Sequence, residues 1–178
     1  MLAGAYVVDH ERKSDFRGFF ARTFCTREFE AHGLRPTVAQ CNVAFNHYRG
    51  TIRGMHYQVG PSRETKLVRC TRGAILDVII DMRPGSPTYL RHVAVELTAE
   101  NHRALYVPGM FAHGYQALTD GAEVTYQVGE FYTPGYERGL RHDDPAFGIE
   151  WPLPVSVISE KDAGWPLFER DDAQGAHA

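Results

Sequence analysis

Hydrophobic and polar residues alternate with a period of two along much of the central part of the chain. The alternating segments are short and rich in Val, Ile, Tyr and Thr, and they cover residues 40–45, 66–71, 74–81, 92–97, 104–108, 114–119 and 123–131. Alternation of this kind is typical of strands with one buried face. Glycine- and proline-containing turns separate the segments at a spacing of roughly ten residues. The pattern therefore predicts a single all-β barrel or sandwich.

Helical signals are short and lie outside this run of strands. Thr26 is a candidate N-cap for a helix over residues 27–32, which Gly33 would end. A second short helix is predicted either after Pro134 or around residues 159–165. The sequence thus predicts a barrel with a few peripheral helices.

One domain accounts for the whole pattern. We predict a single barrel domain over residues 1–170, in which the proline- and aromatic-rich residues 145–162 cover one part of the barrel. The small polar residues 171–178 are expected to form a disordered tail.

Composition and charge narrow the class of partner. The chain has 178 residues, with 43% hydrophobic and 23% charged residues and a formal net charge of -3. This balance is that of an ordinary soluble domain, and it argues against a nucleic-acid or membrane surface as the main partner. Local arginines and lysines, not the overall field, would have to hold an anionic ligand.

Cysteine usage and the N-terminus bear on the compartment. Cys25, Cys41 and Cys70 are scattered and form no C-x-x-C pair, which favours reduced thiols and a cytoplasmic location. The apolar run at the N-terminus is too short for a signal peptide, and no run of about 18 apolar residues occurs. We therefore expect no membrane span.

The stretch IRGMHYQ, residues 52–58, carries the first candidate chemistry. A metal-binding barrel of the cupin type would place two ligands as His-x-His, but here His56 is followed by Tyr57 and Gln58. Even with His113 the set has no third good ligand, so a metal site is weakly supported. On residue types alone, His56 is either a hydrogen-bonded structural histidine or a proton carrier.

Three further residues have both a structural and a chemical interpretation. Tyr126 shares a strand face with Val124 and Val128, so it is a core tyrosine unless its hydroxyl has a task. Lys66 begins a predicted strand, and Asp162 by itself is a solvated acid. No one of these residues establishes an activity.

Taken together, the motifs resemble those of the dTDP-4-dehydrorhamnose 3,5-epimerase family. The matching strings, in order, are DFRGFF (15–20), QCN (40–42), IRGMH (52–56), KLVR (66–69), GAILDVIIDMRPGSPT (73–88), VPGMFAHGY (107–115), TYQ (125–127), FYTPGYERGLRHDDP (131–145), IEWP (149–152) and SEKD (159–162). Each string alone is weak, but ten in the same order cover nearly the whole chain.

The resemblance implies a jelly-roll, cupin-like β-barrel that forms a homodimer and needs no metal or organic cofactor. Its substrate would be a nucleoside-diphosphate 4-keto-6-deoxyhexose, epimerised at C3 and C5. By position, His56 matches the catalytic base and Asp162 the acid that pairs with it. Tyr126 matches the proton donor, and Lys66 the residue near the keto oxygen.

The resemblance also implies substrate-binding residues. The matched positions are Arg17, Arg22, Gln40, Asn42, Arg53, His113, Tyr132, Glu137 and Lys161. Among them Arg53 suits phosphate oxygens, and Tyr132 matches a residue that stacks on the nucleobase. Three departures from the family pattern occur: Arg22 replaces a glutamate, and Cys41 replaces an aspartate. Third, RHDDP (141–145) stands for the usual W-N-D-P, and Tyr126-Gln127-Val128 for the usual Y-K-T. These departures put the nucleotide preference, not the acid–base pair, in question.

Alternatives to the double epimerase differ in chemistry. A C3-only epimerase, or an epimerase of another nucleotide-linked keto-sugar, would keep His56 and Asp162. A metal-dependent cupin enzyme is disfavoured by the missing His-x-His pair. A non-catalytic sugar-binding barrel would not need a base together with an acid.

Overall fold

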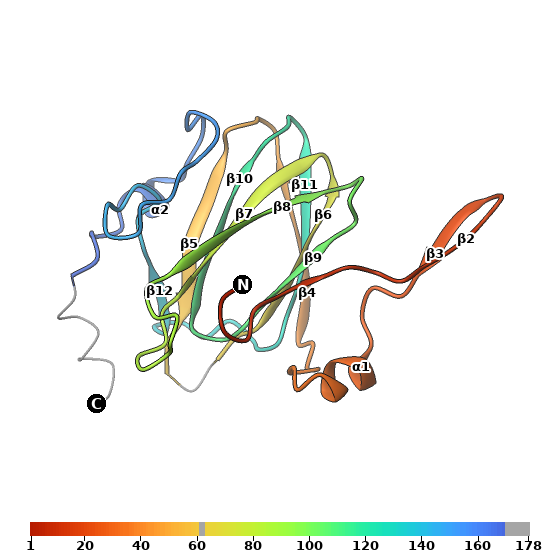
Figure 1. The fold of residues 1–178 in the computed structure, drawn as a ribbon. Coiled ribbons are helices and arrows are strands. Elements are labelled where there is room, and N and C mark those ends of the chain that lie inside the picture. Colours follow the sequence, from red (N-terminus) through yellow and green to blue (C-terminus); the bar gives the residue numbers. More distant parts are fainter. Residues whose placement is uncertain (61–62, 170–178) are drawn as a thin grey trace.

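The computed structural model describes residues 1–60 and 63–169, so the tail predicted over residues 171–178 lies outside the described residues. Two antiparallel five-stranded sheets form the body of the molecule, and a two-stranded hairpin projects from it (Figure 1). In the described part of the chain the only helices are two short ones. The prediction of an all-β, jelly-roll barrel with short peripheral helices is confirmed.

The element order interleaves the two sheets. The first sheet has the order β1-β9-β6-β11-β4, with β1 Tyr6–Val8, β9 Ala104–Val107, β6 Lys66–Arg72, β11 Ala122–Val128 and β4 Gln40–Asn46. The second sheet has the order β12-β5-β10-β7-β8, with β12 Glu137–Gly139, β5 Ile52–Gln58, β10 Phe111–Ala117, β7 Ala74–Asp81 and β8 His92–Thr98. The remaining elements are the hairpin strands β2 Arg12–Asp15 and β3 Gly18–Ala21, and the helices α1 Thr26–Ala31 and α2 Glu160–Ala163.

The core lies between the sheets and continues behind the second one. On β7, Ile75 and Ile79 are fully buried in the cluster that both sheets share. Val78 and Ile80 point to the opposite face of the same strand and pack under the C-terminal segment that contains Phe147. Because both faces of β7 are covered, nearly every position on it is apolar.

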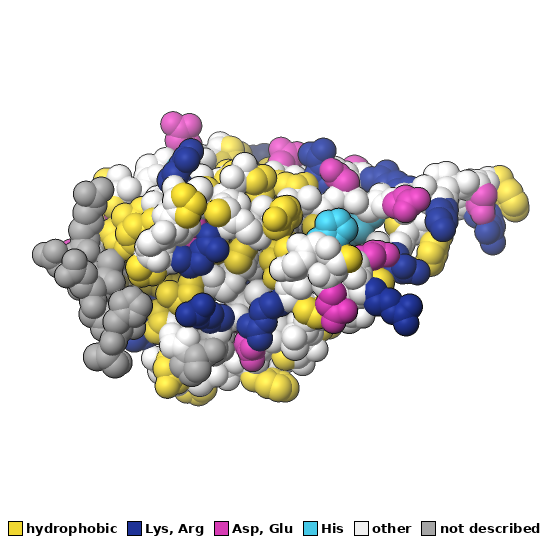
Figure 2. Space-filling view, turned by 60° about the horizontal axis from the view of Figure 1, so that its bottom comes forward, with side chains coloured by type: hydrophobic (Ala, Val, Ile, Leu, Met, Phe, Trp, Pro, Cys, Tyr) yellow, Lys and Arg dark blue, Asp and Glu magenta, His cyan; other side chains and the backbone are white. Residues whose placement is uncertain are grey.

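The β2–β3 hairpin stands apart from the core. Every residue of β2 is exposed, and the hairpin extends away from the two sheets. Figure 2 shows hydrophobic and charged side chains together along this projection. The alternation pattern did not predict β2 or β3, because strands without a buried face carry no apolar alternation. It also missed β1, whose three residues are too few to show a period.

Several predicted boundaries were wrong. The N-cap of α1 is Cys25 and not Thr26, and no side chain caps this helix. Gly33 does follow the helix end, with φ +70, as expected of a residue that stops a helix. Of the two sites predicted for the second helix, the later one is correct: α2 follows its N-cap Ser159. The described residues after Pro134 lead instead into β12.

Two strand ends also differ from the prediction. β10 begins at Phe111, earlier than predicted, because the turn before it is complete at Met110, which has φ 62. β11 ends at Val128, because the N–H of Gly129 already bonds to Thr65 outside the ladder. The segment that contains His56 is a full central strand, β5, which the sequence pattern had not predicted.

Candidate active site

A cavity of about 470 Å³ opens between the two sheets. It is lined by Ala44, Thr51, Ile52, Arg53, His56, Lys66, His113, Tyr115, Tyr126, Val157, Ile158, Ser159, Lys161 and Asp162. Residues from both sheets and from the segment leading into α2 therefore meet at one place. All four residues that the resemblance implied as catalytic are among them.

His56 and Asp162 form the central pair of the cavity. The imidazole Nε2 of His56 donates to Oδ1 of Asp162 at 2.6 Å. The other carboxylate oxygen, Oδ2, accepts the backbone N–H of Gly54 at 3.1 Å. Because Asp162 takes the hydrogen on Nε2, the neutral ring keeps its basic lone pair on Nδ1.

The electrostatics of Asp162 keep it ionised. The residue is only 4% exposed. Burial by itself would raise the pKa of its carboxyl, but the hydrogen bond and charge of His56, with the hydrogen bonds of Gly54 and Ser159, together hold the pKa below its usual value. A buried anion next to His56 is the arrangement that stabilises an imidazolium.

Local structure explains how the pair meets. The segment before α2 joins β5 through a bridge between Thr51 and Val157, and the N–H of Ile52 donates to Val157 at 2.9 Å. Ser159 then caps α2, accepting the N–H of Asp162 at 3.1 Å. These contacts turn the Asp162 carboxylate back towards β5.

Gly54 is required at the point where β5 and β10 approach each other. Its φ is +108, and a Cβ there would lie 2.6 Å from the Cα of Gly114. Only glycine allows both this backbone conformation and this contact. The N–H that holds Asp162 thus depends on a position that no other residue fits.

A second histidine–carboxylate pair lies deeper in the cavity wall. Nε2 of His113 donates to Oδ1 of Asp77 at 2.6 Å, and Asp77 is completely buried. The prediction included His113 but missed Asp77. The signal was present: alternation on β7 places this acid on the same inward face as Ile75 and Ile79.

Tyr126 and Lys66 project from the first sheet. Tyr126 on β11 packs against the core cluster, and burial raises the pKa of its phenol. Lys66 on β6 pairs with Glu64, with Nζ 2.9 Å from Oε2, and both side chains are largely buried. No sequence pattern had identified Glu64 as a partner of Lys66. Burial thus favours the neutral phenol of Tyr126, and the pairing with Glu64 holds the Lys66 side chain in place in the same cavity.

Cations line the rim and wall of the cavity. Arg53 on β5 bonds to two neutral acceptors, Oδ1 of Asn46 at 2.9 Å and the carbonyl of Phe45 at 3.2 Å. Lys161 pairs with Glu137 on β12 at 2.6 Å, so two residues predicted separately as substrate contacts meet at the rim. Unlike Lys66 and Lys161, Arg53 forms no ion pair with a carboxylate of the described residues.

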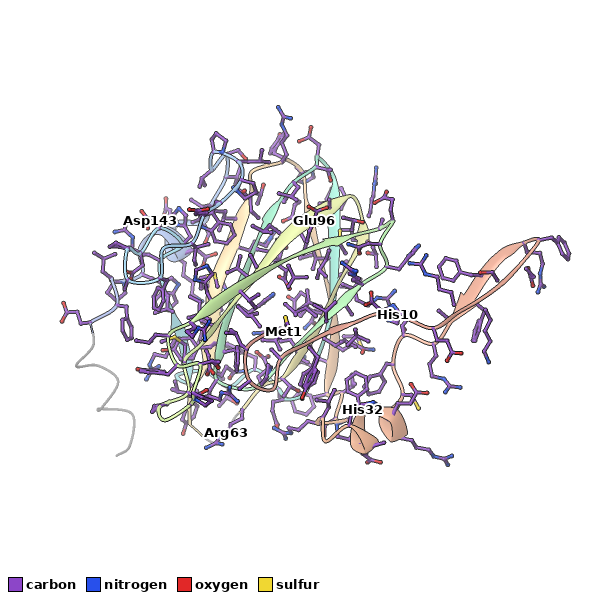
Figure 3. All side chains as sticks on the ribbon, viewed as in Figure 1. Met1, His10, His32, Arg63, Glu96 and Asp143 are labelled. Carbon is purple, nitrogen blue, oxygen red and sulfur yellow. The ribbon has the colours of Figure 1, made fainter. Side chains whose placement is uncertain are left out.

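Six predicted binding residues do not line this cavity, although one of them, Glu137, pairs with the lining residue Lys161. Arg17 is in the turn of the β2–β3 hairpin, paired with Asp15, and Arg22 pairs with Glu28 at 2.9 Å. Arg22 borders a separate hollow of about 240 Å³ between the hairpin and α1, on the side where His10 and His32 are labelled in Figure 3.

The other three of these residues lie nearer the sheets. Gln40 and Asn42 belong to β4, and Asn42 borders a shallow groove of about 310 Å³ that also includes Cys41. Tyr132 follows β11 and is 58% exposed. Within one chain, the structure thus does not bring these residues to the His56–Asp162 pair.

The described residues contain neither a cluster of metal ligands nor a membrane-spanning helix. No group of three or more His, Cys, Asp or Glu is placed to hold a metal ion in this part of the chain. No helix within the described ranges is long and apolar enough to cross a membrane.

A jelly-roll cavity with a histidine–carboxylate pair, a neutral phenol and unpaired cationic charge is suited to acid–base chemistry on an anionic substrate. The family model of dTDP-4-dehydrorhamnose 3,5-epimerase matches residues 1–170. The chain belongs to this family of isomerases, as its motifs predicted.

Known relatives support the assignment. The dTDP-4-dehydrorhamnose 3,5-epimerase of Methanothermobacter thermautotrophicus is 42% identical over 172 residues, covering 94% of this chain and 92% of the relative. The enzyme of the same name from Sinorhizobium fredii is 40% identical over 166 residues, covering 93% and 85%.

Solved structures of epimerases have the same fold as this chain. The Bacillus anthracis enzyme, described with TDP and PPi bound, superposes with a TM-score of 0.89 at 37% identity and covers 93% of this chain and 94% of its own. A 3'-monoepimerase from Streptomyces bikiniensis in complex with dTDP-quinovose has a TM-score of 0.87 at 35% identity, with 98% and 89% covered.

Proposed function

We propose that this protein epimerises a dTDP-linked 4-keto-6-deoxyhexose at C3 and C5, with His56 as base and Tyr126 as acid. The observation that carries the proposal is the placement of these two groups. His56 belongs to the second sheet and Tyr126 to the first, and both line one cavity. A sugar ring held between the sheets would present one face to each group.

Proton abstraction falls to His56. A hydrogen on a carbon next to a ketone is acidic because its anion delocalises onto the keto oxygen. Nδ1 of His56 takes this proton, and the imidazolium that results is stabilised by Asp162. Because C3 and C5 both flank the ketone at C4, the same group serves both carbons in turn.

Residues of the first sheet stabilise the enolate and return a proton to the carbon. Lys66 supplies a positive charge for the enolate oxygen in a partly enclosed cavity. Tyr126, neutral because burial raises its pKa, donates its proton to the opposite face of the carbon and becomes phenolate. His56 then releases its proton to solvent, and the Tyr126 phenolate takes one up from solvent.

The diphosphate is bound by the cations of the cavity. Arg53 has no carboxylate partner among the described residues, and a guanidinium matches phosphate oxygens at two points. Relatives described with TDP and PPi, with dTDP-quinovose and with dTDP-4-keto-L-rhamnose bound support a dTDP-linked ligand. Lys161 at the rim adds a second cation.

A C3-only epimerase is the second candidate. The observation in its favour is the likeness to the Streptomyces bikiniensis 3'-monoepimerase, which is of the same order as the likeness to double epimerases. Both activities need the same base and acid. They differ in whether C5 reaches the base, which a carbon-resolved assay decides.

The deciding experiment follows exchange at each carbon. The protein is incubated with dTDP-4-keto-6-deoxyglucose in deuterated water, and C3 and C5 are observed by NMR. Deuterium at both carbons is expected, and deuterium at C3 alone would establish the monoepimerase. His56→Ala should abolish exchange, whereas His32→Ala, at the exposed end of α1, should not. No exchange by wild-type protein would contradict the proposed function.

We also propose that the active form is a homodimer built on the outer face of the first sheet. On β4, Val43 is 63% and Phe45 41% exposed, a strip of apolar surface on an edge strand. On the same sheet Arg69 is half-buried, and burial lowers its pKa, while the Gln127 Oε1 is buried without a hydrogen-bond partner. Apolar surface beside incompletely bonded polar groups is expected of an interface.

Light scattering coupled to size exclusion tests the dimer. Wild-type protein should have twice the chain mass, and Phe45→Glu should convert it to monomer. Val155→Glu, at a similarly exposed position on the C-terminal segment, is the matched control and should stay dimeric. A monomeric wild type would refute the proposal.

The remaining assignments also stay proposals. We propose that residues 1–170 act as a single domain, as the extent of the family match suggests. A cytoplasmic location is proposed because Cys25, Cys41 and Cys70 are all free thiols.

A further inference from the structure

The buried side-chain amide of Asn46 lies behind one wall of the cavity, where it bonds to the lining residue Arg53. Asn46, the last residue of β4, is 1% exposed. Its Oδ1 accepts from Nε of Arg53 at 2.9 Å, and its Nδ2 donates to the carbonyl of Ala122 at 3.1 Å. A buried amide is costly unless it is bonded, so these contacts fix its orientation. The bond to Ala122 leaves Oδ1 directed at the arginine.

The amide orients Arg53 without cancelling its charge. The guanidinium reaches from β5 in the second sheet to the end of β4 in the first, where it also meets the carbonyl of Phe45 at 3.2 Å. Both of these acceptors are neutral. Other cations of the cavity region, Lys66 and Lys161, are paired with carboxylates. Arg53 is thus held in place and still able to meet an anion.

A third member makes the support rigid. The hydroxyl of Tyr115 on β10 lies 3.3 Å from both Oδ1 and Nδ2 of Asn46. Tyr115 is 4% exposed, and burial raises the pKa of its phenol to about 12. The hydroxyl is therefore neutral at physiological pH. Three strands contribute to one uncharged network behind the arginine.

We propose that Asn46 is the positioning residue for the diphosphate site: it holds the Arg53 guanidinium at the angle at which it binds the phosphate oxygens of the nucleotide sugar. The inference rests on the proposed function, because that function supplies the anion. Asn46 does not touch the substrate itself. Its effect on binding passes through Arg53.

Binding of dTDP, measured by calorimetry, tests the role without requiring catalysis. Asn46→Asp keeps the shape but places a carboxylate against Arg53, and it should weaken dTDP binding by about tenfold or more and flatten its salt dependence. The matched control is Asn101→Asp in the β8–β9 turn, whose side chain bonds to Thr98 and Glu96 away from the cavity. It should bind dTDP as the wild type does.

A double-mutant cycle separates positioning from a general structural effect. Asn46→Ala should weaken dTDP binding in the wild-type background but change it less than about twofold in an Arg53→Ala background. Equal losses in both backgrounds would overturn the proposal. If the Asn46 variants do not fold, Tyr115→Phe removes one support of the amide at nearly constant volume, and wild-type affinity in that variant would overturn it as well.

Failure of the proposal is distinguishable from failure of the proposed function. A wild-type protein that neither binds dTDP nor exchanges deuterium would overturn both. A wild type that binds and exchanges, with an Asn46→Asp variant of equal affinity, would overturn the role of Asn46 alone. In steady-state kinetics over a range of substrate concentrations, Asn46→Asp should raise KM far more than it lowers kcat.

Discussion

Replacing the carboxylate of Asp162 by an amide is the sharpest perturbation of the proposed mechanism. In Asp162→Asn the side-chain oxygen can still accept the N–H of Gly54, but the amide nitrogen then faces Nε2 of His56. An amide N–H there requires Nε2 to accept, which moves the ring hydrogen to Nδ1. The lone pair that should abstract the substrate proton is thereby lost.

The magnitude follows from the geometry of the pair. Opposite charges about 4 Å apart interact by about 4 kcal/mol at an effective dielectric constant of 20. The side chain of His56 is 34% exposed, although that of Asp162 is only 6% exposed. Solvent screening reduces the figure to about 2 to 3 kcal/mol, or roughly 100-fold in rate. The change of tautomer adds to this loss.

Deuterium exchange at C3 and C5 is the assay, because it reports proton abstraction directly. Asp81→Asn is the matched control: it neutralises an equally buried carboxylate that does not line the cavity. Thermal melting of both variants shows that the folded protein is being compared. An Asp162→Asn variant that exchanges within about threefold of wild type would refute the reasoning about the pair.

Three further outcomes are expected. Tyr126→Phe should still exchange deuterium, because His56 can return a proton to the face it took it from, but NMR should show inversion slowed by about 100-fold. Asp81→Asn should lower the free energy of unfolding at neutral pH by about 2 kcal/mol. In the wild type, burial alone would raise the pKa of Asp81, but hydrogen bonds from Arg83, Ser86 and Thr88 outweigh it and lower the pKa from 3.8 to about 2. This contribution to stability is therefore present above about pH 4 and is lost as pH falls towards 2. Urea unfolding at a series of pH values measures it. Cys70, 4% exposed with its pKa raised to about 11 by burial, should react with a thiol reagent far more slowly than exposed Cys41, and equal rates in cysteine-to-serine variants would contradict this.

The sequence allowed prediction of the strands that have one buried face. Where alternation meets the core, as on β6 and β8, predicted and observed strands overlap closely. β7, with both faces covered, was predicted from its nearly continuous apolar run. β5 was missed because Gly54 and the covering of both its faces break the alternation. The N-terminal hairpin was missed because its strands bury no face. A pattern of buried positions therefore carries no information about them.

The site was predicted only in part, because its contacts are long-range. His56 and Asp162 are 106 residues apart, and the resemblance, not the residue pattern, brought them together. Two partners were overlooked: Glu64, which belongs to no matching string, and Asp77, which lies within the string at 73–88 but was not singled out. A buried acid on an apolar strand is a signal of its own: alternation alone would have placed Asp77 inside the barrel, where it needs a partner.

The two-sheet architecture fits the inversion proposed here for His56 and Tyr126 in a way that a single wall could not. A lone base can only return a proton to the face from which it took it, so epimerisation needs a second group across the ring. Here His56 is fixed by its strand pairings to β10 and β12, and Tyr126 by its pairings to β4 and β6. Each group is thus held by neighbours on both sides within its own sheet. The separation of base and acid is set by the spacing of the sheets, which core packing fixes. A substitution that shifts the packing between the sheets should therefore impair inversion more than exchange, even if it touches neither residue.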